Sequence, residues 1–255
     1  MIFLNKKDYD TQHVIVLRRG RLFLLIVYKI EVMEKLASRR KANSYRNISN
    51  LFLLLGIILF FSGIANFFLF FVSFIPFSIS TYFRTRHNTW RIGAEGEESV
   101  IRVLQKLDSS FKVINDIILP GDRQNIDHIV VGSTGTFVIE TKNHNGIIKC
   151  NNDIWSRTKV GRRGTLYSSD IGNPSKQAKR NAVMLRKWLE SENIDVGYIL
   201  AVVVFTNENV ELNLVKPTVK IVHVNDLLEV FKGESNFRMT REKINSVAEK
   251  LYKLK

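Results

Sequence analysis

The sequence predicts an α/β protein with a mixed central sheet flanked by helices, preceded by a transmembrane helical segment. The first observation behind this fold class is an uncharged stretch of 37 residues, 47–83, which has the length and composition of a membrane-crossing segment. The second is the pattern after residue 92, where helical spacing of apolar residues alternates with short apolar runs typical of strands. With 45% hydrophobic and 24% charged residues, the 255-residue chain is neither disordered nor of low complexity.

The uncharged stretch contains the runs LFLLLGIILFF and FFLFFVSFIPF, and neither has the polar face that a soluble helix of this length would show. As one helix it would reach roughly 55 Å at about 1.5 Å per residue, whereas a hydrocarbon core is about 30 Å thick. That length is excessive for one span and slightly short for two spans with a turn. Because residues 62–66 include turn-forming types, we favour a helical hairpin, and a single span is the alternative.

Most of the formal net charge of +14 lies beside this stretch. Residues 1–91 hold 14 Lys and Arg against 4 Asp and Glu, a net charge of +10, which leaves +4 for residues 92–255. The total charge is therefore weak evidence for nucleic-acid binding. Basic residues on both sides of the stretch favour the cytoplasmic face and anionic lipid head groups. We expect a cell-membrane protein whose soluble domain faces the cytoplasm, with membrane lipids as partners.

The pattern divides the chain into four segments. They are a basic N-terminal segment of unassigned role (1–46), the transmembrane segment (47–83), a soluble α/β domain (92–225) and a C-terminal helical extension (226–255). The expected elements are a helix over 93–107, a strand over 111–119, a hairpin over 126–143, a loop-rich stretch over 144–172, a helix over 175–190, strands over 198–205 and 219–224, and a helix over 238–254. The single cysteine, Cys150, excludes an intramolecular disulfide and is interpreted as a structural thiol.

The hairpin over residues 126–143 carries charged residues where buried strands are usually apolar. If residues 132–135 form the turn, the register places Asp127 directly opposite Glu140, and Lys142 falls on the same face because side chains alternate along a strand. Two carboxylates directly opposite each other are destabilising unless their charge is compensated. A divalent cation would compensate it, since Mg²⁺ commonly uses one or two carboxylates together with water and phosphate.

A third carboxylate comes from the helix over residues 93–107. Glu97 precedes Val100, Ile101 and Leu104 at helical spacing, which places it on the core-facing stripe, whereas Glu95 and Glu98 fall outside the centre of that stripe. A carboxylate that faces the core needs a partner. The alternative is an ordinary acidic residue near a helix N-terminus, favoured by the macrodipole. Gly93 and Gly96 would allow this end of the helix to approach a neighbour closely.

The segments GAEGE, IDHIVVGSTGTFVIETKN and NPSKQAKRN together resemble the nuclease-related domain (NERD) of the PD-(D/E)xK superfamily, over roughly residues 92–205. The resemblance implies a restriction-endonuclease-like fold and a metal-dependent phosphodiesterase core that uses Mg²⁺ or Mn²⁺. Asp127 matches the metal-binding aspartate of the motif, and Glu140 and Lys142 match its E-x-K. Glu97 matches the acidic residue of the first helix, and Gln177 the glutamine of the later helix.

These residues suit phosphodiester hydrolysis, which needs an activated water and stabilisation of charge on the phosphoryl oxygens. Asp127 and Glu140 would hold the cation. Glu97 would add a ligand through a water molecule or orient a group that binds the cation. Lys142 would orient or deprotonate the attacking water, or offset phosphate charge, and Gln177 would hold Lys142 or the water. The alternative is a cross-strand salt-bridge cluster on an exposed face, with Gln177 an ordinary first-turn residue.

The segment SRTKVGRRG, residues 156–164, is the candidate nucleic-acid interface because Lys and Arg contacts to phosphate dominate such binding. Its basic residues are Arg157, Lys159, Arg162 and Arg163. A solvated basic loop beside the membrane is the alternative. His144 could reach substrate but is interpreted as a solvated loop residue, His128 faces away from Asp127, and Trp155 is interpreted as a core or loop anchor.

The function predicted from the sequence is that of a membrane-anchored, metal-dependent nuclease that hydrolyses phosphodiester bonds, with DNA favoured over RNA as the nucleic-acid partner. The competing class is a non-catalytic module of the same fold that binds nucleic acid or protein at the membrane. The sequence predicts neither the oligomeric state nor the mode of cleavage.

Overall fold

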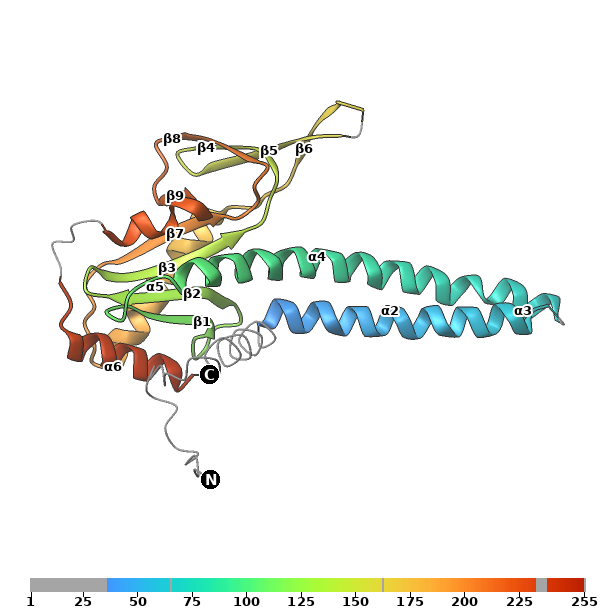
Figure 1. Cartoon of the computed structure of the whole chain (residues 1–255), viewed down its shortest axis with the longest axis horizontal. Coiled ribbons are helices and arrows are strands. Elements are labelled where there is room, and N and C mark those ends of the chain that lie inside the picture. The colour runs from blue at the N-terminus through green and yellow to red at the C-terminus, as the bar shows by residue number, and fades with distance from the viewer. Residues whose placement is uncertain (1–35, 65, 162, 233–237, 255) are drawn as a thin grey trace, which may run out of the picture. The chain divides into compact units, whose positions relative to one another are not determined.

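The computed structural model describes residues 36–64, 66–161, 163–232 and 238–254, which contain the helices and strands in Figure 1. Most of the basic N-terminal segment, residues 1–35, lies outside this part of the chain. The helices are α2 (Ala37–Ser62), α3 (Phe67–Val72), α4 (Phe74–Leu104), α5 (Pro174–Ser191), the 3₁₀ helix η1 (Val224–Lys232) and α6 (Arg241–Tyr252). The strands are β1 (Lys112–Ile118), β2 (Asn125–Gly132), β3 (Gly135–Lys142), β4 (Gly146–Asn151), β5 (Ile154–Val160), β6 (Leu166–Ser169), β7 (Ile199–Phe205), β8 (Val210–Val215) and β9 (Lys220–His223).

The uncharged stretch forms two long helices that pack side by side, α2 and the first part of α4 (Figure 1). Their interface contains small residues, which let the backbones approach. The hydroxyl of Ser49 donates to the carbonyl of Ser80 at 3.0 Å, and the hydroxyl of Ser80 donates back to the carbonyl of Ser49 at 2.9 Å. A Cβ on Gly56 would lie 3.0 Å from the ring of Phe77, so glycine allows this contact.

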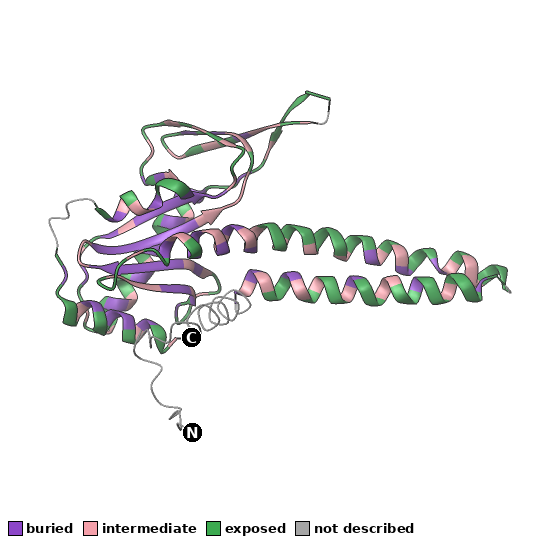
Figure 2. Ribbon diagram, in the orientation of Figure 1, coloured by how far each residue is buried: buried purple, intermediate pink, exposed green. Residues whose placement is uncertain are grey.

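Much of the surface of this helical pair is exposed, whereas the strands of the central sheet are mostly buried (Figure 2). Exposed large apolar side chains between residues 51 and 75 are Leu51, Leu54, Leu55, Ile57, Ile58, Phe60, Phe61, Ile64, Phe67, Phe68, Phe71, Phe74 and Ile75. Two helical segments, Ala37–Ser62 and Phe67–Leu104, are long and apolar enough to cross a membrane. An exposed apolar surface of this extent is characteristic of a face that water does not contact.

Helix α4 continues without a break from the uncharged stretch into the sheet domain (Figure 1). The sequence pattern predicted a helix that begins at residue 93, and the structure begins it at Phe74. The reason is that residues 84–92 contain neither glycine nor proline, so the change from apolar to charged side chains does not interrupt the helical backbone.

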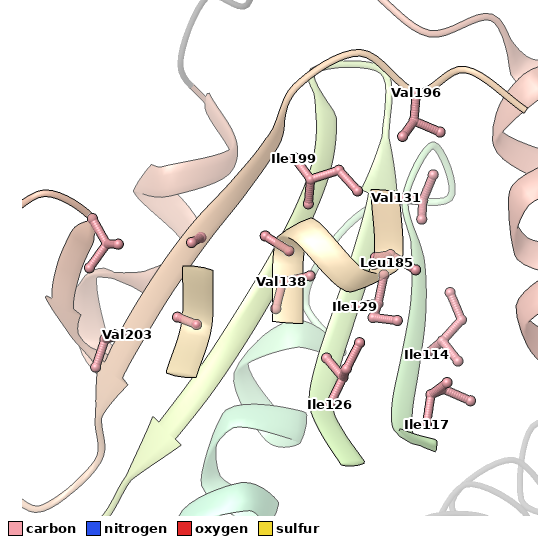
Figure 3. Packing of buried hydrophobic residues seen from close by; sticks show 14 of the residues in the cluster. Ile114, Ile117, Ile126, Ile129, Val131, Val138, Leu185, Val196, Ile199 and Val203 are labelled. Atoms are coloured by element: carbon pink, nitrogen blue, oxygen red, sulfur yellow. The ribbon is translucent and has the colours of Figure 1, made fainter. Parts of the chain in front are cut away.

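The predicted mixed central sheet flanked by helices is confirmed in the described chain. Its five strands have the order β1-β2-β3-β7-β9, antiparallel from β1 to β3 and parallel from β3 to β9. One face packs on α4 and η1 through residues that include Val100, Phe137 and Leu227. The other face packs on α5 and α6, and Figure 3 shows Ile129, Val138 and Leu185 gathered between strands and helix.

The register of the central hairpin matches the prediction over the pairs that the structure contains. Gly132 pairs with Gly135, Val131 with Thr136 and His128 with Ile139. Because β3 pairs with β7 in parallel on its other side, the strand that carries Glu140 is interior to the sheet. Both neighbours therefore fix the direction in which its side chains point.

The prediction of a loop-rich stretch over residues 144–172 was wrong. Strands β4, β5 and β6 lie in it and form a second sheet with β8, in the order β6-β5-β4-β8. Strands β4 to β6 contain few apolar residues, because the sheet is largely exposed. Its fully buried core residues are Ile148 and Cys150 of β4, and Trp155 of β5 packs against the core partly buried. A mostly exposed sheet lacks the apolar runs by which strands are recognised in a sequence.

Candidate active site

Three of the predicted residues lie together at one edge of the central sheet, where β2 begins and β3 ends. Alternation along the strands puts Asp127, Glu140 and Lys142 on the face that α5 covers. The Lys142 Nζ donates to Glu140 Oε1 at 2.7 Å and to Gln177 Oε1 of α5 at 3.2 Å. Gln177 is thus in contact with the lysine of the E-x-K motif, and α5 reaches the site through its first turn.

Asp127 is held by the backbone of the neighbouring strand. Its Oδ2 accepts a hydrogen bond from the Thr141 backbone N–H at 2.8 Å. The paired register ends at His128–Ile139, and its continuation by one residue would set Asp127 opposite Glu140 on the adjacent strand. Burial raises the pKa of Asp127 to about 6, while the Thr141 N–H and the Lys142 charge oppose that rise.

Glu140 is the most buried acid of the site, with 2% of its surface exposed. Its Oε1 is bonded to Lys142, but its Oε2 is buried and has no hydrogen-bond partner among the described residues. A buried acceptor left without a donor is costly. Burial, followed by the charge of Asp127, raises the pKa of Glu140 to about 8. The environment of Glu140 therefore disfavours its negative charge more than Lys142 alone compensates.

Glu97 approaches the same edge from α4. Burial and then the charge of Asp127 raise the pKa of Glu97 to about 8, which indicates that the two carboxylates interact. Its Oε2 accepts a hydrogen bond from the hydroxyl of Ser38 at 2.9 Å. The close approach of α4 depends on Gly96, where a Cβ would lie 2.8 Å from the Cβ of Asn143. No described atom lies within 4 Å of a Cβ placed on Gly93, so the expected close approach holds for Gly96 alone.

A fourth acid, Asp116 of β1, was not predicted as a site residue. The β1–β2 register skips Asp116, whose backbone has φ of +56° and lies opposite Asp127. Its Oδ1 accepts from Asn125 Nδ2 at 2.8 Å, and its Oδ2 accepts from the Ala37 N–H at 2.8 Å. Its charge contributes to the raised pKa of both Asp127 and Glu97. The pair Asn115-Asp116 within an otherwise apolar strand was the available signal in the sequence.

Glu98, expected outside the centre of the core-facing stripe, is nevertheless buried, on the side of α4 that faces α2. Its Oε1 accepts from the Nε of Arg39 at 2.7 Å and from the Nη2 of the same residue at 2.5 Å. The physical reason is that α4 is covered on two sides, by the sheet and by α2, so it has two buried stripes. Glu95 is half-buried and pairs with Arg91 at 2.8 Å.

The residues that could hold a cation in this cluster are Asp127 and Glu140, with Glu97 nearby. If all three carboxylates of raised pKa are ionised, they and the unpartnered Glu140 Oε2 require positive charge beyond that of Lys142. Within the described ranges, no group of three or more His, Cys, Asp or Glu side chains has the arrangement of a metal site. Two protein carboxylates with water and phosphate completing the shell is the arrangement that Mg²⁺ commonly takes.

The candidate nucleic-acid residues occupy β5 and the turn after it, and they differ in their surroundings. Arg157 is only 7% exposed, and its guanidinium donates to the carbonyl and side chain of Asn145 at 2.8 and 2.6 Å and to His144 Nδ1 at 3.1 Å. Lys159 is half-buried and Arg163 is exposed, while Arg162 lies outside the described residues. Arg157 thus braces the end of β3 against β5.

Four further residues singled out in the sequence lie near the site or in the core. His128 is fully buried and bonds to Asn115 at 2.9 Å and Thr141 at 3.1 Å. Trp155 packs on Phe205, and its Nε1 donates to the hydroxyl of Ser175 at 3.1 Å. Cys150 is a buried free thiol. His144 is half-buried, and burial together with the charge of Arg157 lowers its pKa to about 4.

A sheet edge with paired acids, a lysine two positions after the second acid and a third acid from a packed helix defines a nuclease-like class of site. The family model of the nuclease-related domain, NERD, matches residues 92–206 of this chain. The matched segment includes Glu97, Asp127, Glu140, Lys142 and Gln177, and the match confirms the resemblance to the nuclease-related domain.

Two further comparisons bear on the chain. An uncharacterized protein of Bacillus anthracis is 46% identical over 63 residues, which cover 23% of this chain and 29% of that relative. The chain therefore matches less than a third of the relative's length. No solved structure matches this chain.

Proposed function

We propose that this protein is a membrane-anchored nuclease that requires Mg²⁺ or Mn²⁺ and hydrolyses phosphodiester bonds, with DNA as the favoured substrate. The observation that carries the proposal is the buried, unpartnered Oε2 of Glu140 beside Asp127 and Lys142. A buried acceptor without a donor lowers the stability of the folded state unless a ligand binds it. The match of residues 92–206 to a nuclease-related domain supports the same class of activity.

Asp127 and Glu140 are the residues that would hold the cation, with Glu97 as a further ligand or as a support for one. When bound, such a cation supplies charge stabilisation at a phosphoryl oxygen and lowers the pKa of a bound water. The chain's own residues supply orientation. The Thr141 N–H fixes one oxygen of Asp127, which leaves the other for the cation.

Lys142 is the proton-handling and charge-compensating group of the proposal. Its ammonium bridges Glu140 and Gln177, so it is held at the edge of the sheet by two acceptors from different elements. A lysine held in this way can donate to a phosphate oxygen or hold the attacking water in line. Gln177 is a positioning residue in this scheme, because it contacts the lysine.

Membrane anchoring is the second part of the proposal. It is supported by the exposed apolar surface of the α2–α4 pair and by basic residues on both sides of the uncharged stretch. With both flanks in the cytoplasm, the sheet domain and its site face the cytoplasm. We assign the contacts with substrate phosphate to Lys159 and Arg163, because the guanidinium of Arg157 already donates hydrogen bonds to His144 and Asn145.

The experiment uses the full chain in detergent micelles, incubated with linear DNA, circular DNA and RNA in Mg²⁺, Mn²⁺ or EDTA. The variants Glu140→Gln and Lys142→Met test the site, and each has a matched control on the exposed surface of α5, Glu190→Gln and Lys187→Met. The site variants should lose at least about 100-fold in rate and the controls should keep it. Cleavage that survives in EDTA or in both site variants would refute the proposed site, and binding without cleavage by the wild type would favour a non-catalytic module.

A further inference from the structure

The first turn of α2 contacts the acids of the candidate site through three consecutive residues. The Ala37 N–H donates to Asp116 at 2.8 Å, the Ser38 hydroxyl donates to Glu97 at 2.9 Å, and Arg39 pairs with Glu98 at 2.5 Å. These three acids belong to α4 and β1, which are separate elements of the sheet domain. One helical turn therefore supplies a backbone donor, a hydroxyl and a guanidinium to the acidic edge.

This turn is built into the domain although it lies well before the segment that matches the nuclease-related family, residues 92–206. Leu36 is 2% exposed and Ser38 is 5% exposed, so both are packed as core residues. The helix N-terminus also carries partial positive charge, which favours a nearby carboxylate such as Asp116. An anchor alone would need none of these contacts, since apolar surface suffices to hold a helix in a bilayer.

We propose that Ser38 is a positioning residue that orients Glu97, so that the membrane hairpin completes the cation site. The proposal rests on the proposed function, because it takes Glu97 as a group that serves the cation. The Ser38 hydroxyl engages Oε2 of Glu97 and leaves Oε1 for the cation or its bound water. Groups that orient metal-binding carboxylates typically contribute a factor of about 10 to 100 to metal affinity.

The neighbouring contacts explain how Ser38 is itself held. The Arg39–Glu98 pair ties the turn to α4 one residue away, and the Ala37–Asp116 bond ties it to β1. Both contacts restrict the rotation of α2 about its axis. As a result the hydroxyl of Ser38 points at one oxygen of Glu97.

The test measures Mn²⁺ affinity by calorimetry and by electron paramagnetic resonance on the full chain in detergent micelles. Ser38→Ala should bind Mn²⁺ about 10- to 100-fold more weakly than the wild type, and Ser38→Thr, which keeps the hydroxyl, should restore most of the affinity. The matched control is Ser49→Ala, because Ser49 is a buried serine of the same helix that bonds to Ser80 rather than to the site. Its affinity should equal that of the wild type.

A double-substitution cycle separates positioning from damage to the fold. If Ser38 acts through Glu97, Ser38→Ala should have no further effect on affinity once Glu97→Gln is present. An equal loss in both backgrounds would overturn the proposal, and so would an unchanged affinity in Ser38→Ala or a failure of Ser38→Thr to restore binding. If Glu140→Gln abolishes Mn²⁺ binding while Ser38→Ala leaves it intact, the proposed function stands and the role of Ser38 falls. If the wild type binds no Mn²⁺, both fall.

Discussion

Two glycines three positions apart in α4 provide a matched test of how closely this helix must approach the site. A Cβ on Gly96 would lie 2.8 Å from Asn143 Cβ and 3.0 Å from Thr206 Oγ1, whereas a Cβ on Gly93 would have no described atom within 4 Å. Asn143 directly follows Lys142, and its Cβ cannot rotate away because it is fixed to the backbone. Gly96→Ala therefore forces α4 away from the end of β3.

The magnitude follows from two terms. Replacing glycine by alanine inside a helix stabilises the fold by about 1 kcal/mol, and this gain is common to both positions. Overpacking costs about 1–3 kcal/mol and applies to Gly96 alone. The difference between the two variants is therefore the overpacking cost itself. For a chain of this size, about 1 kcal/mol corresponds to roughly 2–4 °C in Tm.

The assay is thermal unfolding of the full chain in detergent micelles, with Mn²⁺ affinity measured on the same samples. We expect Gly93→Ala to raise the Tm slightly and Gly96→Ala to lie at least about 2 °C below it, with weakened Mn²⁺ binding because Glu97 moves with the helix. Equal Tm values for the two variants, or a Gly96→Ala protein with the higher Tm, would refute the close approach of α4 to the site.

The remaining predictions concern pH, the second sheet and topology. The folded-state pKa values of Glu140 and Glu97, about 8, exceed the ordinary value of 4.5, so ionising these carboxyls lowers folded-state stability. The Tm of chelator-treated protein should therefore fall from pH 5 to pH 8, and Mn²⁺ should reverse the fall. Glu140→Gln should make the fall smaller, because Glu97 still titrates. A Tm that rises over this range would contradict the raised pKa values. Arg157→Ala should lower the free energy of unfolding by at least about 2 kcal/mol, because it removes three hydrogen bonds of a buried charged donor. Arg163→Ala should leave the Tm unchanged but weaken DNA binding, and it should reduce the salt dependence of that binding by about one unit of slope. If Arg157→Ala instead kept its Tm and lost DNA binding, while Arg163→Ala lost stability, a structural role for Arg157 would be excluded. Cysteine labelling in intact cells, in a Cys150→Ser background, should modify Ile64→Cys from outside and spare Asn88→Cys; labelling at 88 alone or at both positions would rule out the hairpin.

The sequence predicted those parts of the fold that short-range patterns encode. The register of the central hairpin followed from the length of the turn at residues 132–135, because each side chain's face is fixed once one pair is known. Strand β7 and helix α5 followed from apolar runs and helical spacing. The second sheet did not follow, since its strands face solvent and carry few apolar residues.

The predicted site residues came from the hairpin register, from helical spacing and from a family motif, and the residues that were missed lie outside these patterns. Asp116 was missed because it occupies a left-handed position that the strand pattern does not reveal, and Ser38 because it precedes the domain by about fifty residues. The burial of Glu98 depends on α2, a long-range contact that helical periodicity within α4 cannot encode. Short-range sequence patterns therefore identify the candidate catalytic and metal-binding residues, but they do not identify the side chains that contact those residues in the folded protein.

The unbroken helix α4 sets a fixed stand-off between the site and a bilayer. Glu97 follows Phe83, the last residue of the uncharged stretch, by fourteen positions in one continuous helix, which is about 21 Å along the axis. With the hairpin in a membrane, that rise is a ceiling on the height at which a substrate can be engaged. Under the proposed anchoring, only molecules within about 21 Å of the apolar layer would be within reach, so the helix would select its substrates by where they are in the cell as well as by their chemistry.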